Sequence, residues 1–153
     1  MQSLHGHIIK ATPSMDDPFF TGASIFITEH DEKGAAGFVF NKPSGHFLNQ
    51  LEEFKHCKSI PLYEGGPVDK EHIFVIHIRP DLIEEGTPIS NGIYLGGNFS
   101  QAISALGEGA ISTSQIKLFI GYCGWNTGEL EAEIAESNWQ LTPALPQEVF
   151  NNY

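Results

Sequence analysis

Cys123 is the side chain whose surroundings in the sequence most suggest reactivity. It lies in the run Gly-Tyr-Cys-Gly-Trp at 121–125, just before a predicted helix, and a helix N-terminus lowers the pKa of a nearby thiol. No basic residue lies close to it in the sequence to assist. We therefore favour a small buried residue at a strand end. A thiol sensor acting through Cys123 remains the alternative.

The seven histidines form no metal-binding pattern within one element. His5 and His7 share one face of a predicted strand, whereas His72 and His77 flank another strand and face opposite sides. Neither His-x-x-x-His nor His-Glu-x-x-His occurs, so we predict no metal site and no cofactor. The Gly-x-Ser-x-Gly elbow of serine hydrolases is also absent. The sequence therefore assigns no catalytic residue.

Three glycine turns follow predicted strand ends: Gly65-Gly66-Pro67, Gly96-Gly97, and Gly121 with Gly124. Glycine lets a backbone pass close to a ligand, and the second turn leads into a predicted helix whose N–H groups would suit an anion. None of the turns matches a dinucleotide or P-loop fingerprint. Ordinary turn chemistry is the favoured interpretation.

The elements that must position these residues are mainly strands. Runs rich in β-branched and aromatic residues predict strands at 7–12, 24–28, 37–41, 73–78, 92–95 and 117–122, and a short edge strand at 139–142. A turn at 31–34 predicts a hairpin. Apolar spacing predicts helices at 48–56, at 99–107 capped by Asn98, and at 127–137 with a capping box from Asn126 to Glu129. We expect one α+β domain over 1–153, with a mainly antiparallel sheet or open barrel flanked by about three helices.

The net charge limits the classes of partner that we expect. The 153 residues carry 8 Lys and Arg against 19 Asp and Glu, a formal charge of −11. Nucleic acids and anionic membranes attract clustered cations, so we expect neither as a partner. Glutamates at 129, 133 and 136 recur at helical spacing, and we interpret them as a solvated face. No signal peptide is evident in residues 1–7, and no apolar run approaches about 20 residues, so we expect a cytoplasmic protein.

A set of short segments is distinctive in combination: 13–20, 29–30, 34–43, 65–68, 77, 96–97, 121–125, 128, 130–131 and 138–139. Together they resemble the AlgH/YqgE family of bacterial proteins. The resemblance implies an α+β fold with a central, mainly antiparallel sheet. Family members are labelled uncharacterised or transcriptional regulators, and no established catalytic residue carries over. Relatives often continue beyond residue 153, so we expect apolar surface at Phe150 that a second copy would cover as a homodimer.

Three functional hypotheses follow. The first is a non-enzymatic regulatory or binding protein that acts through a protein or small-ligand partner. The second is an enzyme on a small metabolite, with His30 as general base and Asn41 as an oxyanion or substrate donor. The third is the thiol sensor described above. The candidate surface or ligand site comprises Met15, Asp17, Phe20, His30, Asn41, Gly65, Gly66, Pro67, Gly96, Gly97, Tyr122 and Trp125.

Overall fold

A curled, mostly antiparallel sheet forms the body of the protein in residues 3–153, the part of the chain that this computed structural model describes. Its strands are β1 His7–Ala11, β2 Ser24–Asp31, β3 Gly34–Val39, β4 Pro43–Phe47, β5 Pro61–Glu64, β6 Val68–His77, β7 Thr87–Ser90, β8 Ile93–Leu95, β9 Ile116–Asn126 and β10 Trp139–Pro143. The order is β10-β1-β2-β3-β9-β6-β8-β7, with β5 parallel to β9 and β4 paired to β5. The sheet curls into a half-barrel.

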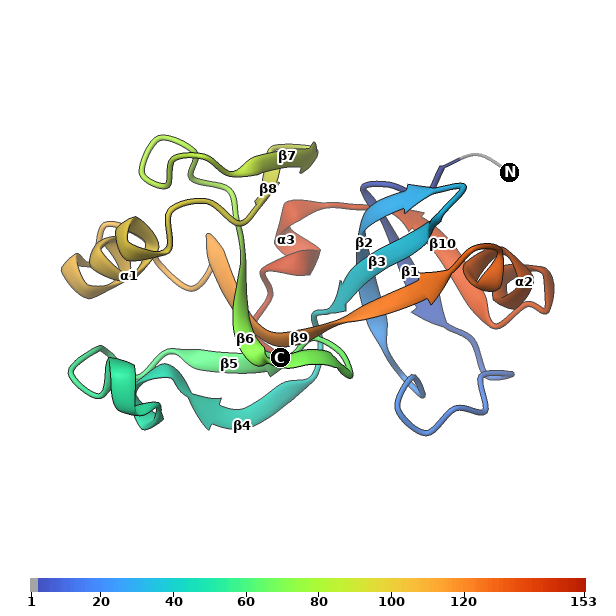
Figure 1. Cartoon of the computed structure of the whole chain (residues 1–153), viewed down its shortest axis with the longest axis horizontal. Helices are drawn as coiled ribbons and strands as arrows, with labels where there is room; N and C mark the ends of the chain where they lie inside the picture. Colours follow the sequence, from blue (N-terminus) through green and yellow to red (C-terminus); the bar gives the residue numbers. More distant parts are fainter. Residues whose placement is uncertain (1–2) are drawn as a thin grey trace.

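Strand β9 joins the two halves of this sheet (Figure 1). Its last residues pair with β3, and its first residues pair with β6 on one side and with β5 on the other. Side chains along a strand point alternately to opposite faces. Leu118 therefore packs in the cluster beneath the first helix, while Phe119 enters the central cluster with Phe38 and Phe40.

Three helices accompany the sheet in the described residues: α1 Phe99–Glu108, α2 Glu129–Ala135 and α3 Pro146–Val149. Figure 1 shows α1 and α2 at opposite ends of the long axis. The Asn98 side chain accepts a hydrogen bond from the Gln101 N–H and caps α1, as predicted. Helix α1 ends one residue later than predicted, where Gly109 adopts a left-handed conformation.

The helix predicted at 48–56 is wrong. The segment forms two 3₁₀ turns, η1 Leu48–Gln50 and η2 Glu52–Phe54, with Leu51 extended between them. A spacing of three residues aligns side chains in a 3₁₀ helix, which has 3.0 residues per turn. Leu48, Leu51 and Phe54 therefore still face the core cluster that contains Leu106.

The predicted end of β9 was also wrong. The strand runs to Asn126, so Gly121 and Gly124 lie inside it and the Asn126–Glu129 capping box does not form. Gly128 is the N-cap of α2 instead, with a left-handed backbone. Strands β4, β5 and β7 were not predicted. Each contains a proline, which is confined to edge strands and strand starts and weakens the sequence signal.

Phe150 is buried rather than exposed. Helix α3 places it in the central cluster with Ile8 and Phe26, and 3% of its surface is accessible. The expectation that a second copy covers Phe150 is therefore wrong.

None of the helices within 3–153 has the length and apolar character needed to cross a membrane. Met1 and Gln2 lie outside the described residues. They belong to residues 1–7, in which we predict no signal peptide.

Candidate functional site

A groove of about 590 Å³ opens where β3, β6 and β9 meet. We call it the aromatic groove. It is lined by Thr28, Glu29, Ala35, Ala36, Phe38, Val68, Phe74, Leu95, Tyr122, Gly124, Trp125 and Asn126. This volume lies within the range of about 300–1,000 Å³ that is usual for small-molecule sites.

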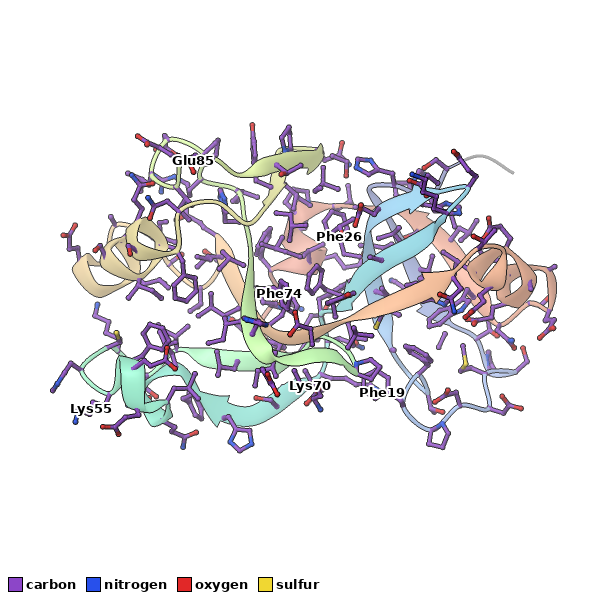
Figure 2. All side chains as sticks on the ribbon, viewed as in Figure 1. Phe19, Phe26, Lys55, Lys70, Phe74 and Glu85 are labelled. Carbon is purple, nitrogen blue, oxygen red and sulfur yellow. The ribbon has the colours of Figure 1, made fainter. Side chains whose placement is uncertain are left out.

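Three aromatic rings from three strands build one wall of the aromatic groove. The ring centroids of Phe38 and Phe74 are 5.6 Å apart, and Tyr122 lies 6.4 Å from Phe38 and 5.6 Å from Phe74. Phe74, labelled in Figure 2, lies in the middle of the long axis, where β6 crosses β9. Tilted and edge-to-face contacts at these distances hold the rings in place. The three rings thus support one another without a ligand.

The other end of the aromatic groove is small and polar. Ala35 and Ala36 on β3 lie opposite Trp125 and Gly124 on β9. The two alanines and Gly124 leave space at this end of the groove, beside Trp125. The β2–β3 ladder shifts register between Ile27 and Glu29, and Glu29 is exposed at this end.

A second hollow of about 250 Å³ continues the groove towards the β2–β3 turn. It shares Glu29, Ala35, Ala36 and Trp125 with the aromatic groove and adds Asp31, Lys33 and Gly34. The resulting channel leads from an aromatic wall to a region with two carboxylates and one lysine.

Two of the three glycine turns meet, and the third lies elsewhere. The Gly65 N–H donates to Ile120 O, and Gly65 O accepts from Val39 N–H, so this turn joins β3 to β9. Side chains at Gly66 and Gly121 would collide with the backbone of the other segment, as discussed below. Pro67 follows this turn and is exposed.

The Gly96-Gly97 turn packs on buried His77 instead. His77 Nε2 donates to Gly96 O at 3.1 Å, Nδ1 accepts from Arg79 N–H at 3.1 Å, and the ring stacks on Tyr94. Burial lowers the pKa of His77, which keeps the ring neutral and fully hydrogen-bonded. The Asn98 N–H donates to Glu84 O and the Gln101 N–H donates to the Asn98 side chain, so two of the donors at the start of α1 are already used within the protein.

Met15 and Phe20 belong to a different cluster, on the face of β9 that carries Cys123. Phe20 stacks on Trp125 with ring centroids 6.3 Å apart and meets Trp139 edge-to-face at 5.5 Å. Asp17 accepts a hydrogen bond from the Phe19 N–H and organises the preceding turn. The structure therefore uses these three predicted residues for packing and turn formation.

His30 and Asn41 do not form a common cleft. The side-chain amide of Asn41 is hydrogen-bonded at the start of β2, where its oxygen accepts from Ser24 N–H and its nitrogen donates to Gly22 O. His30 lies six residues further along the same strand, about 20 Å away at 3.3 Å per residue. Its Nδ1 accepts from Leu4 N–H at 2.8 Å, and Nε2 lies 3.4 Å from Glu131 Oε2. Both nitrogens are engaged, which removes the basis for His30 as a general base.

The thiol of Cys123 is buried in the middle of β9 and is 1% exposed. Its Sγ donates to Gly65 O at 3.4 Å. Burial raises the pKa of the thiol to about 12, so the thiolate needed for redox chemistry is scarce at neutral pH. The predicted buried role holds, although in the middle of a strand rather than at its end.

The sequence analysis missed two polar side chains with unusual surroundings, Lys117 and Glu133. Lys117 is 3% exposed, and in the sequence it is a lysine flanked by Ile116 and Leu118. Ser114 stands three residues earlier, the Ser-x-x-Lys spacing of some acyl-transfer enzymes, but its hydroxyl bonds to Ser112. Glu133, interpreted as part of a solvated face, instead accepts hydrogen bonds from two buried tryptophans.

Within residues 3–153 no cluster of three or more His, Cys, Asp or Glu side chains could hold a metal ion. These features define the class of the protein: an α+β half-barrel with an aromatic groove across its central strands. The chain belongs to the AlgH-like family, whose model matches residues 8–153.

Known relatives agree with this assignment. A UPF0301 protein of Idiomarina loihiensis is 36% identical and aligns over 99% of this chain and 85% of its own. One from Chlorobaculum tepidum is 34% identical, over 96% and 79%. The solution structure of AlgH from Pseudomonas aeruginosa superposes with a TM-score of 0.78 at 30% identity, covering 98% of this chain and 82% of that one. A crystal structure from Corynebacterium diphtheriae shares the fold, with a TM-score of 0.78 at 24% identity over 99% and 81%.

Proposed function

We propose that this protein is a non-enzymatic binding protein that takes a small ligand with an aromatic or apolar body into the aromatic groove. The observation that carries the proposal is the wall of Phe38, Phe74 and Tyr122 within a groove of about 590 Å³. Phe74 and Tyr122 are partly exposed and pack against buried Phe38, so they give a ligand a contact surface that is already ordered, at little entropic cost.

The lining favours binding over catalysis. Among the described residues that line the aromatic groove there is no histidine, cysteine, serine or lysine. Glu29 is the one carboxylate of the lining, and the hydroxyls are those of Thr28 and Tyr122. Thr28 Oγ1 donates to Ala36 O, and the described lining holds no basic side chain that would activate either hydroxyl as a nucleophile. The groove is therefore suited to recognition, and ligand-dependent contact with a protein partner is the regulatory mode that we propose.

The charge at the polar end selects the ligand. Glu29 and Asp31 lie along the channel against the single cation Lys33, and the whole chain carries −11. A cationic or hydrogen-bond-donating head group would therefore be drawn to this end, whereas an anionic one would be repelled.

We also place the protein in the cytoplasm, since Cys57 and Cys123 are both free thiols.

Three matched indole probes test the proposal: tryptamine, indole and indole-3-acetate, which are cationic, neutral and anionic at pH 7. Amide chemical-shift mapping should place each bound probe at residues 35–38 and 122–126. We expect tryptamine to bind about tenfold more tightly than indole-3-acetate, a difference of about 1.4 kcal/mol.

Variants assign the two ends of the groove. Tyr122→Ala should weaken all three probes about tenfold because it removes one ring of the wall. Glu29→Gln should abolish the preference for tryptamine, whereas Glu32→Gln, on the exposed turn outside the groove, should retain it. Shifts that fall outside the aromatic groove, or no shifts at millimolar probe, would overturn the proposal.

A further inference from the structure

The amine of Lys117 lies inside the protein, against three aromatic rings. Its Nζ is 4.0 Å from the ring centroid of Tyr63, 4.9 Å from that of Tyr153 and 5.9 Å from that of Phe40. Among residues 3–153, no carboxylate forms an ion pair with it. We call Phe40, Tyr63, Asn151 and Tyr153 the lysine cage.

The hydrogen bonds of Lys117 suit a neutral amine. Nζ donates to Phe40 O at 2.9 Å and to Asn151 O at 2.8 Å. A neutral amine has two N–H donors, which these two acceptors satisfy, and its lone pair is left unused. Among the described residues, the third N–H of an ammonium group would have only the faces of the aromatic rings as acceptors. Burial lowers the pKa of Lys117 to about 7, so a large fraction of the amine is neutral at physiological pH. A neutral, desolvated lysine is a nucleophile towards carbonyl compounds.

A short stretch of chain, residues 151–153, lies against Lys117 and Tyr63, and we call it the strap. All three of its residues are exposed. Tyr153 N–H donates to the Tyr63 hydroxyl at 3.2 Å, and the Tyr153 hydroxyl donates to Glu148 O at 3.0 Å. A cavity of about 10 Å³ lies beside Lys117, between Asn152 of the strap and Tyr63. Lifting the strap breaks the hydrogen bonds of Tyr153 to Tyr63 and Glu148 and that of Asn151 O to Lys117, and it opens the space next to the amine.

We propose that Lys117 is a modification site that forms an imine with a small, neutral aldehyde when the strap lifts. The lone pair of Nζ attacks the carbonyl carbon, and the C–O π electrons move to oxygen, which takes a proton. The carbinolamine then loses water as a C=N bond forms. One amine and one aldehyde thus give one imine and one water, with no oxidant or reductant.

The lysine cage selects for this chemistry. Ring faces and backbone carbonyl oxygens are electron-rich, so they repel an anionic aldehyde and attract a cation. A protonated imine keeps the positive charge over the rings and has one N–H, enough for Phe40 O but not for Asn151 O as well. Imine formation therefore removes the hydrogen bond that ties the strap to Lys117, and the modified protein should hold its strap open.

Site-resolved reductive labelling tests the proposal. The folded protein is treated at pH 7 with propionaldehyde, which is neutral, or glyoxylate, which is anionic, each with cyanoborohydride to trap the imine. Peptide mass spectrometry then gives the labelling rate of each lysine, with the other six as internal references. We expect Lys117 to react with propionaldehyde about tenfold faster than the exposed lysines, and to show no such advantage with glyoxylate.

Variants of the strap separate gating from simple burial. Tyr153 is 44% exposed, so Tyr153→Ala should fold, and we expect it to raise the rate at Lys117 about fivefold by loosening the strap. Tyr153→Phe keeps the ring and should stay within about twofold of the parent. Labelling of Lys117 no faster than that of Lys55 and Lys58, in both the parent and Tyr153→Ala, would overturn the proposal. An equal advantage with glyoxylate would overturn the ligand class.

Discussion

The indole nitrogens of Trp125 and Trp139 donate to the same atom, Oε1 of Glu133, at 3.2 and 2.9 Å. The tryptophans lie on β9 and β10, and the glutamate lies on α2, so one carboxylate ties the helix to two separated strands. Hydrogen bonds to a charged acceptor contribute about 1.5–3 kcal/mol each. We expect Glu133→Ala to lower the free energy of unfolding by about 2–4 kcal/mol in urea denaturation.

The control for this variant lies on the same helix. Glu129 is exposed in the first turn of α2, so Glu129→Ala should cost less than about 1 kcal/mol, mainly through the helix dipole. Glu133→Gln keeps an oxygen acceptor and should recover part of the loss. If Glu129→Ala and Glu133→Ala lower the free energy of unfolding equally, the two tryptophan hydrogen bonds to Glu133 do not contribute to stability.

Gly121 is expected to tolerate no side chain. It has φ +71, and a Cβ there would lie 2.4 Å from Gly66 O. Gly121→Ala combines backbone strain with a clash against main-chain atoms, so we expect a loss of about 3 kcal/mol or more in thermal or urea unfolding.

Gly124, three residues along β9, provides the matched comparison. A Cβ there would meet Tyr122 at 3.7 Å, an ordinary van der Waals contact, and no positive φ is involved. Gly124→Ala should therefore change stability by less than about 1 kcal/mol. Comparable losses at the two glycines would refute the close approach of Gly66 and Gly121.

The titration of Lys117 should make stability depend on pH in the alkaline range. Its pKa is about 7 in the folded protein and about 10.4 in an unfolded chain. Between these values the unfolded chain binds a proton that the folded protein has released, so the free energy of unfolding rises with pH. The slope is at most about 1.4 kcal/mol per pH unit.

Lys117→Met removes this titration and leaves the other groups in place. Denaturant unfolding of both proteins at pH 7, 8 and 9 isolates the difference between them. We expect the stability of the parent to rise relative to Lys117→Met over this series. Parallel curves would mean that the folded-state pKa of Lys117 is not lowered.

Duplex DNA should not bind tightly, even at low salt. Three of the cations already face carboxylates: Lys55 pairs with Glu52 at 3.1 Å, Lys70 with Glu64 at 2.7 Å and Arg79 with Asp81 at 2.8 Å. Lys55 and Lys70, labelled in Figure 2, also lie well apart along the long axis. Phosphate contacts would have to break these pairs against a charge of −11. In anisotropy titrations of a random duplex at about 20 mM salt, tight, salt-sensitive binding would contradict this expectation.

Local signals in the sequence determined much of the fold. Side-chain periodicity and turn chemistry within a few residues predict the β2–β3 hairpin, the strands around residues 7–12 and 117–122, and α1 with its Asn98 cap. The same kind of signal failed at 48–56, where a spacing of three apolar residues suits either an α-helix or successive 3₁₀ turns.

The candidate sites depend on contacts that no local pattern encodes. Tyr122 was a predicted site residue, but Phe38 and Phe74 join it only because β3 and β6 pair with opposite sides of β9. Lys117 looks in sequence like the ordinary start of a strand. Its unusual environment is assembled from Phe40, Tyr63 and the strap, which are brought together by packing across up to 77 positions of sequence separation. Burial and the identity of distant neighbours set the chemistry of such a group, and only the tertiary structure decides both.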